Sequence, residues 1–249
     1  MKQQENKIDT YRRKFLGEGV ALAATVTIAP GVLLHNIARA KPAEEAVTSE
    51  VRWGFLIDAN KCASDCNACV TACNEENGLT GFDRPETDAQ WIRKVTVRDK
   101  QTNFSVNLPM MCQHCAEPPC VDVCPTGASM KREDGIVLVD KHICIGCRYC
   151  MMACPYKARS FVHETLTDQL PDMPRGKGTV ESCTLCVHRV DRGETPACAE
   201  ACVDAEKGAI LFGDLNDANS DIAKRIAAEA STQVRGDLRL DPGVRYQGI

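Results

Sequence analysis

Short apolar runs alternate with cysteine-rich loops along most of this chain. Four such runs lie at Val51–Ile57, Gly135–Val139, Ala158–Val162 and Ala209–Phe212, and each is only a few residues long. Apolar runs of this length between polar or turn-forming residues are typical of short buried strands. The pattern therefore predicts short strands joined by loops.

The remaining patterned segments predict a hairpin and one helix. Trp91–Val97 and Phe104–Met110 flank a charged turn, which predicts a β-hairpin at the surface. Residues 219–230 predict a helix with Ser220 as its N-cap. Gly236–Ile249 has neither helical nor strand periodicity, so we expect either a frayed terminus or an arm that lies on a partner subunit.

The first 40 residues carry the features of an export signal. Arg12-Arg13-Lys14-Phe15-Leu16 resembles the twin-arginine core RRxFL, and a weakly apolar stretch follows from Gly17 to Leu34. Ala38-Arg39-Ala40 fits the A-x-A cleavage rule, so the mature chain would begin at Lys41. Two alternatives are a basic amphipathic helix and an uncleaved anchor, although the stretch is short against the ~20 residues that span a bilayer. Because the twin-arginine route carries folded proteins, it favours a cofactor inserted in the cytoplasm.

Cysteine is the unusual component of an otherwise ordinary composition. The chain has 249 residues, of which 44% are hydrophobic and 26% charged, and 16 are cysteines. A chain of this length does not need disulfides to compensate for a small core, so we expect the cysteines to bind metal. Residues 1–40 carry six Lys/Arg and three Asp/Glu, which leaves 24 Lys/Arg, 31 Asp/Glu and a net charge of −7. This acidic remainder argues against nucleic-acid binding, which requires a basic face.

All sixteen cysteines fall into four groups of four. The spacings are C-x3-C-x2-C-x3-C in the first quartet, C-x2-C-x4-C-x3-C-P in the second, C-x2-C-x2-C-x3-C-P in the third and C-x2-C-x11-C-x3-C in the fourth. In chain order the quartets are Cys62, Cys66, Cys69, Cys73; Cys112, Cys115, Cys120, Cys124; Cys144, Cys147, Cys150, Cys154; and Cys183, Cys186, Cys198, Cys202. The third is the bacterial ferredoxin motif, whose last cysteine ligates the other cluster of a pair. The spacing predicts four [4Fe–4S] clusters with crossed ligation.

Crossed ligation assigns the last cysteine of each quartet to a neighbouring cluster. We pair the second quartet with the third, and the first with the fourth around them. The predicted ligand sets are Cys62, Cys66, Cys69 and Cys202 (set 1); Cys183, Cys186, Cys198 and Cys73 (set 2); Cys112, Cys115, Cys120 and Cys154 (set 3); and Cys144, Cys147, Cys150 and Cys124 (set 4). The predicted fold is α+β and loop-rich: an outer ferredoxin-like unit (41–110 and 175–218) with the hairpin as an insertion, an inserted unit (111–174), and a C-terminal helix and tail (219–249).

Other uses of these residues stay open at this point. Two C-x2-C pairs can form a closed zinc site, and the fourth quartet alone fits one. Disulfides are a second alternative, against which the C-x2-C spacing and the export signal argue. Imidazole replaces thiolate in some clusters, but we expect His114 and His188 to make supporting hydrogen bonds, since four cysteines already serve each cluster. No triad, phosphate loop or acid–base pair is found, so no catalytic residue is predicted.

Three long strings carry a resemblance to a known family. They are MCQHCAEPPCVDVCPTGA from Met111, HICIGCRYCMMACPYKAR from His142 and SCTLCVHRVDRGETPACAEAC from Ser182. The chain resembles the four-cluster ferredoxin subunits of membrane-bound oxidoreductases, such as polysulfide, tetrathionate and formate-dependent nitrite reductases. Within that family, the twin-arginine start, the wide first quartet and the ending Tyr246-Gln247-Gly248-Ile249 resemble the periplasmic iron–sulfur subunit of the transmembrane complex linked to dissimilatory sulfite reductase.

The resemblance implies an electron-transfer subunit with no small-molecule substrate of its own. It implies a polytopic, quinone-interacting membrane partner, a multihaem c-type cytochrome beside it, and a periplasmic position on the outer face of the cytoplasmic membrane. Any haem would belong to a partner, because no C-x-x-C in this chain is followed by His. The alternative is an iron–sulfur subunit of a periplasmic molybdopterin oxidoreductase, and the identity of the neighbouring subunit separates the two.

Overall fold

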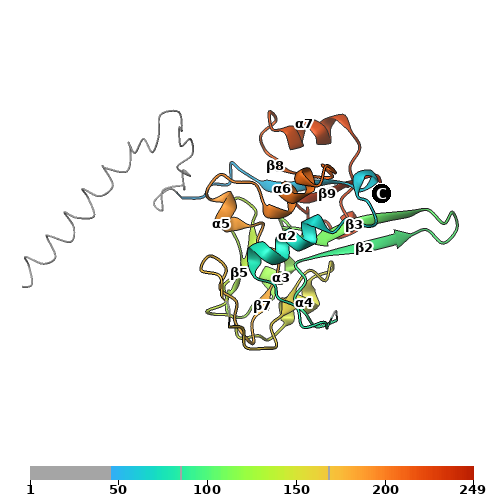
Figure 1. Cartoon of the computed structure of the whole chain (residues 1–249). Coiled ribbons are helices and arrows are strands. Elements are labelled where there is room, and N and C mark those ends of the chain that lie inside the picture. Colours follow the sequence, from blue (N-terminus) through green and yellow to red (C-terminus); the bar gives the residue numbers. More distant parts are fainter. Residues whose placement is uncertain (1–45, 85, 168) are drawn as a thin grey trace, which may run out of the picture. The chain divides into compact units, whose positions relative to one another are not determined.

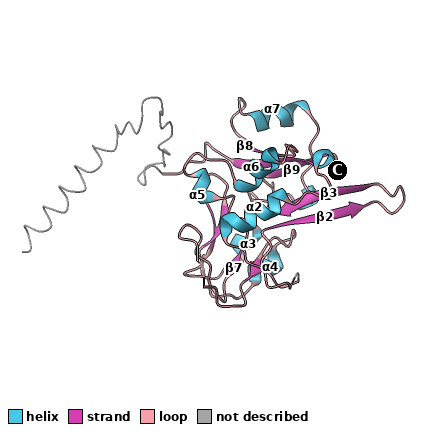
Figure 2. Ribbon diagram, in the orientation of Figure 1, coloured by secondary structure: helices cyan, strands magenta, loops and turns pink. Residues whose placement is uncertain are grey.

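The computed structural model describes residues 46–84, 86–167 and 169–249, and the predicted export signal at 1–40 lies outside them. Short helices and strands alternate with long loops, as expected of a loop-rich α+β fold (Figure 2). In chain order the elements are β1 (Trp53–Asp58), the 3-10 helix η1 (Ala59–Lys61), α2 (Ala68–Asn77), β2 (Ile92–Arg98), β3 (Ser105–Met111), α3 (Pro119–Asp122), β4 (Ser129–Lys131), β5 (Val137–Val139), α4 (Tyr149–Ala153), β6 (Ser160–Phe161), β7 (Val180–Glu181), α5 (Val187–Val190), α6 (Ala197–Asp204), β8 (Ile210–Asp214), α7 (Asp221–Ala228), the 3-10 helix η2 (Gly236–Leu238) and β9 (Val244–Gln247). Among the described helices, none is long and apolar enough to cross a bilayer.

Strand β1 is the centre of a three-stranded sheet that joins distant parts of the sequence. It pairs antiparallel with β8 and parallel with β9 (Figure 1). Phe55 lies opposite Phe212 on one side and Val244 on the other. Phe55, Leu56 and Ile57 are all buried, which explains why the middle of this strand is apolar at consecutive positions instead of at alternate ones. As predicted, the segment before the first quartet lies beside the segment after the fourth.

The predicted hairpin is formed by β2 and β3. Its register places Ile92 opposite Met111 and Val95 opposite Leu108. Ile92, Leu108 and Met111 are buried at the base, whereas Val97 is half exposed towards the tip, which projects away from the other elements in Figure 1. Because β3 runs directly into the second quartet, the register of the hairpin fixes where that cysteine loop begins.

Two short two-stranded sheets follow. β4 pairs with β5 within the predicted inserted unit, whereas β6 pairs with β7, which lies in the second segment of the predicted outer unit. The strands predicted at 135–139 and 158–162 are present but shorter, at Val137–Val139 and Ser160–Phe161. Their partners β4 and β7 were not predicted, because segments of three and two residues that include Ser, Lys or Glu show no strand pattern.

Helix α7 begins where the sequence predicts. Ser220 Oγ accepts a hydrogen bond from the Ala223 N–H (3.2 Å) and donates one to the Asp214 carbonyl (2.6 Å). Ile222 is fully buried against β8, where a Cβ placed on Gly213 would lie 2.8 Å from Ile222 Cγ2. One cap and one apolar side chain therefore hold α7 against the sheet.

The C-terminal segment is neither frayed nor an arm on a partner, which corrects the expectation for Gly236–Ile249. Val244–Gln247 forms β9, and Tyr246 is fully buried. The Tyr246 hydroxyl donates to the Pro109 carbonyl (3.2 Å) and accepts from Gln113 Nε2 (3.3 Å). A four-residue strand with two polar side chains is too short to show periodicity, and its burial comes from pairing with β1.

The same segment also braces the second quartet. The Ala116 N–H donates to the Asp241 carbonyl (3.0 Å), and the Glu117 N–H donates to the Leu240 carbonyl (3.2 Å). Arg52, just before β1, donates to the Asp241 carboxylate (2.5 Å). The end of the protein therefore ties the second cysteine loop to the outer sheet.

Candidate metal centres

All sixteen cysteines lie in the described residues, and none is bonded to another cysteine. Eleven are buried, four are partly exposed and Cys147 is exposed. Within the described part of the chain, no three His, Cys, Asp or Glu side chains converge tightly enough to hold a single metal ion. Zinc needs its thiolates around one ion, whereas a four-iron cube spreads its ligands over four corners. The sixteen unbonded cysteines are thus all available as metal ligands.

Two pairs of short helices carry the C-x3-C ends of the quartets. α2 carries Cys69 and Cys73 and packs against α6, which carries Cys198 and Cys202 (Figure 1). α3 packs against α4 in the same way, and the last cysteines of the second and third quartets follow these two helices. Residues four apart lie on one helix face, about 6 Å apart along the axis. Each helix pair therefore brings the last two cysteines of one quartet beside the last two of another, at two levels along the helix axes.

Proline and glycine fix the local turns of these loops. α3 begins at Pro119 and α6 follows Pro196, positions at which a missing N–H removes no helical hydrogen bond. α2 ends at Gly78, whose φ of 61° is the left-handed conformation of a helix C-cap. In the third quartet, a Cβ on Gly146 would lie 2.1 Å from the Gly178 carbonyl oxygen, so the close approach of these two loops requires glycine.

The four cysteines of set 1 interact with one another. Burial, followed by the charges of Cys202, Cys62 and Cys66, raises the pKa of the Cys69 thiol to about 11. Cys202 Sγ also accepts a hydrogen bond from the Ala209 N–H, just before β8 (3.2 Å). The structure thus brings the last cysteine of the fourth quartet to three cysteines of the first.

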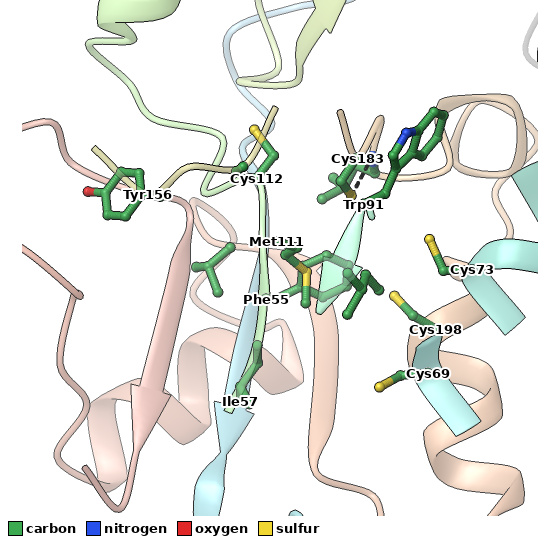
Figure 3. Close-up of a cluster of buried hydrophobic side chains, with 14 of the residues drawn as sticks. Phe55, Ile57, Cys69, Cys73, Trp91, Met111, Cys112, Tyr156, Cys183 and Cys198 are labelled. Carbon is green, nitrogen blue, oxygen red and sulfur yellow. Dashed lines mark hydrogen bonds between the residues drawn. The ribbon is translucent and has the colours of Figure 1, made fainter. Parts of the chain in front are cut away.

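The four cysteines of set 2 also lie together. Burial, with the charges of Cys183 and Cys186, raises the pKa of Cys73 well above its ordinary value. The pKa of Cys198 is raised by burial and then by Cys186 and Cys73. Figure 3 shows Cys73 beside Cys198 on the facing helices α2 and α6. Here the last cysteine of the first quartet joins three from the fourth.

The four cysteines of set 3, from the two inner quartets, lie close to one another. Burial, followed by the charges of Cys112, Cys120 and Cys154, raises the pKa of the Cys115 thiol to about 12. All four are buried. The last cysteine of the third quartet therefore lies with the first three of the second.

Set 4 is the most exposed of the four. Burial raises the pKa of Cys150 against the charge of Arg159, and nearby Cys144 raises it further. Burial also acts to raise the pKa of Cys124, but hydrogen bonds, first from the Ser129 N–H (3.3 Å), outweigh it and lower the pKa. Cys147 is exposed on the third-quartet loop. The grouping of Cys124 and Cys147 with this set rests on the packing of α3 against α4 and on the shared loop.

Cysteines of one set also lie near enough to act electrostatically on those of the next, and in the described chain these neighbours follow one order. Each of them raises the pKa of a buried thiol through the charge of its neighbour in the adjoining set. The neighbouring pairs are Cys69 with Cys73 between sets 1 and 2, Cys183 with Cys112 between sets 2 and 3, and Cys150 with Cys120 between sets 3 and 4. The four sets therefore follow one another as 1, 2, 3 and 4.

The two histidines singled out from the sequence do not take ligand positions. His114 Nδ1 accepts a hydrogen bond from the Val137 N–H (3.0 Å), so the ring proton lies on Nε2. Burial, with the charge of Arg159, lowers the pKa of His114 to about 3, which keeps the ring neutral. His188 Nε2 lies 2.7 Å from Glu76 Oε1, so its partner is a carboxylate and not a cysteine.

Buried donors beside the cysteines fit a cluster that offers sulfide acceptors. His114 Nε2 is buried and has no acceptor among the described residues. Arg159 Nη2 donates to Cys120 Sγ (3.0 Å), while its Nε and Nη1 are buried without an acceptor there. Asn77 Nδ2 lies 3.6 Å from Cys73 Sγ. Neither Arg159 nor Asn77 was predicted, and the one sequence signal for Arg159 is a charge inside an apolar strand pattern.

Comparison with known proteins identifies the family of this chain. The family described as "4Fe-4S dicluster domain" matches residues 52–128 and residues 103–214. The chain is 40% identical to the Hdr-like menaquinol oxidoreductase iron-sulfur subunit 1 of Archaeoglobus fulgidus, over 94% of this chain and 97% of the relative. It is 36% identical to the B subunit of tetrathionate reductase from Salmonella typhimurium (97% and 90%). It is 37% identical to the B subunit of the anaerobic dimethyl sulfoxide reductase of Escherichia coli, over 61% of this chain and 69% of the relative.

The two matched segments together span all four quartets. Two dicluster domains and sixteen cysteines give the chain four [4Fe–4S] clusters, with four cysteines available for each. The chain therefore belongs to the 4Fe-4S dicluster family of iron–sulfur subunits, which transfer electrons in oxidoreductase complexes and are not themselves catalytic.

Proposed function

We propose that this chain is a linear electron wire between a quinone-interacting membrane subunit and further redox partners, in dissimilatory sulfur metabolism. Each cluster takes three ligands from one quartet and the fourth from its partner quartet, in ligand sets 1 to 4. The observation that carries the proposal is the single order in which cysteines of neighbouring sets lie close together. A row of redox centres that are neighbours in one order conducts electrons from end to end.

The chain's own residues hold the centres in line and keep water away from them. When bound, the clusters supply one-electron redox chemistry. The helix pairs α2–α6 and α3–α4 fix the spacing within each pair of sets. Backbone N–H groups donate to sulfurs of sets 1, 2 and 4, which stabilises negative charge there. The acceptors are Cys202 (3.2 Å), Cys183 (3.4 Å), Cys144 (3.5 Å) and Cys124 (3.3 Å).

Set 4 has the surface expected of a terminus that meets a protein partner. Cys147 is exposed, and large apolar side chains on the same loop and on α4 are exposed with it. Ile145 is 67% exposed and Met152 is 73% exposed. Large apolar side chains gathered around an exposed redox ligand favour contact with another protein over contact with water. We therefore assign set 4 as an electron entry or exit point.

The partners follow from the relatives and from the sequence resemblance. A relative named as a menaquinol oxidoreductase subunit supports a quinone-interacting membrane partner. The multihaem c-type cytochrome and the link to sulfite reduction rest on the resemblance of the chain's two ends to the sulfur-complex subunit. The test is a pull-down of the tagged chain from solubilised membranes. It should recover a polytopic membrane protein together with a haem-staining cytochrome.

A second candidate is the iron–sulfur subunit of a periplasmic molybdopterin oxidoreductase. The 36% identity with the tetrathionate reductase subunit across nearly the whole chain favours it. The wire would be the same, and only the neighbouring subunit would differ. Recovery of a molybdopterin protein in the pull-down, without a cytochrome, would replace the first proposal by this one.

We also propose a periplasmic location, peripheral on the outer face of the cytoplasmic membrane. The support is the twin-arginine motif in residues 1–40. Changing Arg12 and Arg13 together to lysine should retain the chain in the cytoplasm, as followed by cell fractionation. N-terminal sequencing of the exported wild type should begin at Lys41, whereas an intact start in the membrane fraction would indicate an uncleaved anchor.

Metal analysis of the purified chain tests the cofactor assignment within this proposal. Four clusters require about sixteen irons per chain and as many acid-labile sulfides. Zinc in the place of iron would contradict the wire. Low-temperature EPR with a potentiometric titration should then resolve four centres.

A further inference from the structure

Arg159 places a buried positive charge between ligand sets 3 and 4. Its side chain is 6% exposed at the start of β6, and Nη2 donates to Cys120 Sγ of set 3 (3.0 Å). The same positive charge lies near enough to act electrostatically on Cys150 of set 4 and on Cys112 of set 3. One side chain therefore acts on the sulfurs of two neighbouring centres.

Within the described residues, Arg159 forms no ion pair with a carboxylate. The comparison is Arg175, an equally buried arginine, which donates to both oxygens of the buried Glu181. A buried cation needs a counter-charge, because water no longer compensates it. For Arg159 the available counter-charges are the thiolates of sets 3 and 4. The buried Nε and Nη1 have no acceptor in the described chain either, which leaves them free to face cluster sulfides.

The outer pair of sets carries a neutral group beside its corresponding cysteines. Asn77, at the end of α2, is 1% exposed and donates to the Cys73 carbonyl (2.8 Å), with Cys73 Sγ at 3.6 Å. Its amide also acts on the nearby Cys186, so both of the sulfurs that it influences belong to set 2. The inner pair is thus bridged by a charge, and the outer pair is contacted by an amide.

We propose that Arg159 is a shared counter-ion that raises the reduction potentials of the clusters in sets 3 and 4 together. The proposal rests on the proposed ligand sets. Reduction adds one electron to a centre that is already negative, and a buried positive charge stabilises that added charge strongly where water is excluded. Because the charge of Arg159 acts on both sets, it favours transfer of an electron from set 2 to set 3 without opposing its onward step to set 4.

The experiment compares the potentials of all four centres in variants of the full chain. Arg159→Met and Arg159→Gln remove the charge, and Arg159→Lys keeps it. Arg148→Met is the matched control, because it removes one exposed charge on the third-quartet loop; this guanidinium lies over the Phe161 ring (3.7 Å to the centroid) and is screened by water. Iron and sulfide are measured first, and EPR is then followed through a titration with dithionite and redox mediators.

We expect two of the four centres to shift together to more negative potentials in both neutral variants, and the other two to stay in place. Arg159→Lys should keep most of the wild-type potentials, and Arg148→Met should shift them less than Arg159→Met does. Loss of the same two centres from the neutral variants, with their retention in Arg159→Lys, would equally support a required charge.

Fully loaded neutral variants with unchanged potentials would overturn the inference, as would an equal shift of all four centres. The wild-type arm separates this failure from that of the proposed function. If wild type holds four centres and the variants do not move them, the role of Arg159 fails alone. If wild type itself lacks four centres, the wire fails as well.

Discussion

Replacing Arg175 by methionine should strongly destabilise the folded chain, because it leaves a buried carboxylate without its counter-charge. Arg175 donates to the two Glu181 oxygens at 3.0 and 2.7 Å and to the Gly78 carbonyl at 2.7 Å. The two side chains are 6% and 0% exposed. Removing one partner of such a pair costs about 3–5 kcal/mol. Since each 1.4 kcal/mol is tenfold, the folding equilibrium should fall by about 10²- to 10⁴-fold.

The loss should reach the clusters, because Glu181 lies in a segment that supports two ligand sets. Val180, its neighbour in β7, donates its N–H to Cys144 Sγ (3.5 Å) in set 4. Cys183 of set 2 follows on the same segment. Displacement of β7 should therefore expose both centres to water and accelerate their breakdown.

The assay is anaerobic bleaching of the visible cluster absorbance in denaturant. Cluster loss makes unfolding irreversible, so the rate of bleaching is the appropriate measure of stability. Arg175→Met should bleach much faster than wild type. The double variant Arg175→Met with Glu181→Met should recover much of the loss, because a well-packed apolar pair can replace a buried ion pair. Arg235→Met, in an exposed pair with Asp237, should behave like wild type.

Two results would refute this reasoning. The first is wild-type bleaching in Arg175→Met, which would mean that the ion pair carries no stability. The second is a double variant that bleaches as fast as Arg175→Met, which would mean that the stranded charge is not the cause.

Three further predictions use the same bleaching and iron assays. Ile222→Ala should cost about 2–5 kcal/mol by opening a cavity under α7, and bleaching at the wild-type rate would contradict that packing. Deletion of 240–249 removes β9 together with the Leu240 and Asp241 carbonyls and should lower the iron content, with the set 3 signal lost first; full iron loading would contradict the bracing role. Burial opposes ionisation of Asp241, but hydrogen bonds, first from Arg52, outweigh it and lower the pKa of this carboxyl. The ionised carboxylate therefore stabilises the folded chain above the ordinary carboxyl pKa, and this stabilisation is lost as the pH falls through the lowered pKa of the folded state. Asp241→Asn should therefore flatten the acid-side rise in bleaching rate, at a cost of at most about 1 kcal/mol near neutral pH.

The sequence predicted those parts of the fold whose signals are local. The apolar run of β1, the alternating hairpin β2–β3 and the Ser220 cap of α7 each depend on a short stretch of chain, and each is present. The role of the sixteen cysteines as cluster ligands was also predictable, because metal ligation restricts residue type and spacing more tightly than packing does.

The parts that the sequence missed depend on contacts between distant segments. Tyr246 is buried because β9 lies beside β1 and near the start of the second quartet, and nothing in a four-residue segment reveals those neighbours. Arg159 reaches Cys120, which lies 39 residues earlier in the chain. In the sequence, Arg159 only interrupts the apolar pattern of a predicted strand, and the fold is needed to show which sulfurs lie near it.

Crossed ligation can be tested most directly by asking whether the last cysteine of a quartet controls the same EPR signal as an earlier cysteine of its own quartet or of the partner quartet. Serine variants at Cys124, Cys147, Cys154 and Cys115 would each be titrated alongside wild type. The account predicts that Cys124→Ser and Cys147→Ser alter one and the same centre, and that Cys154→Ser and Cys115→Ser alter another. If Cys124→Ser instead alters the centre that Cys115→Ser alters, each quartet encloses its own cluster, and the ordered row of centres proposed here is wrong.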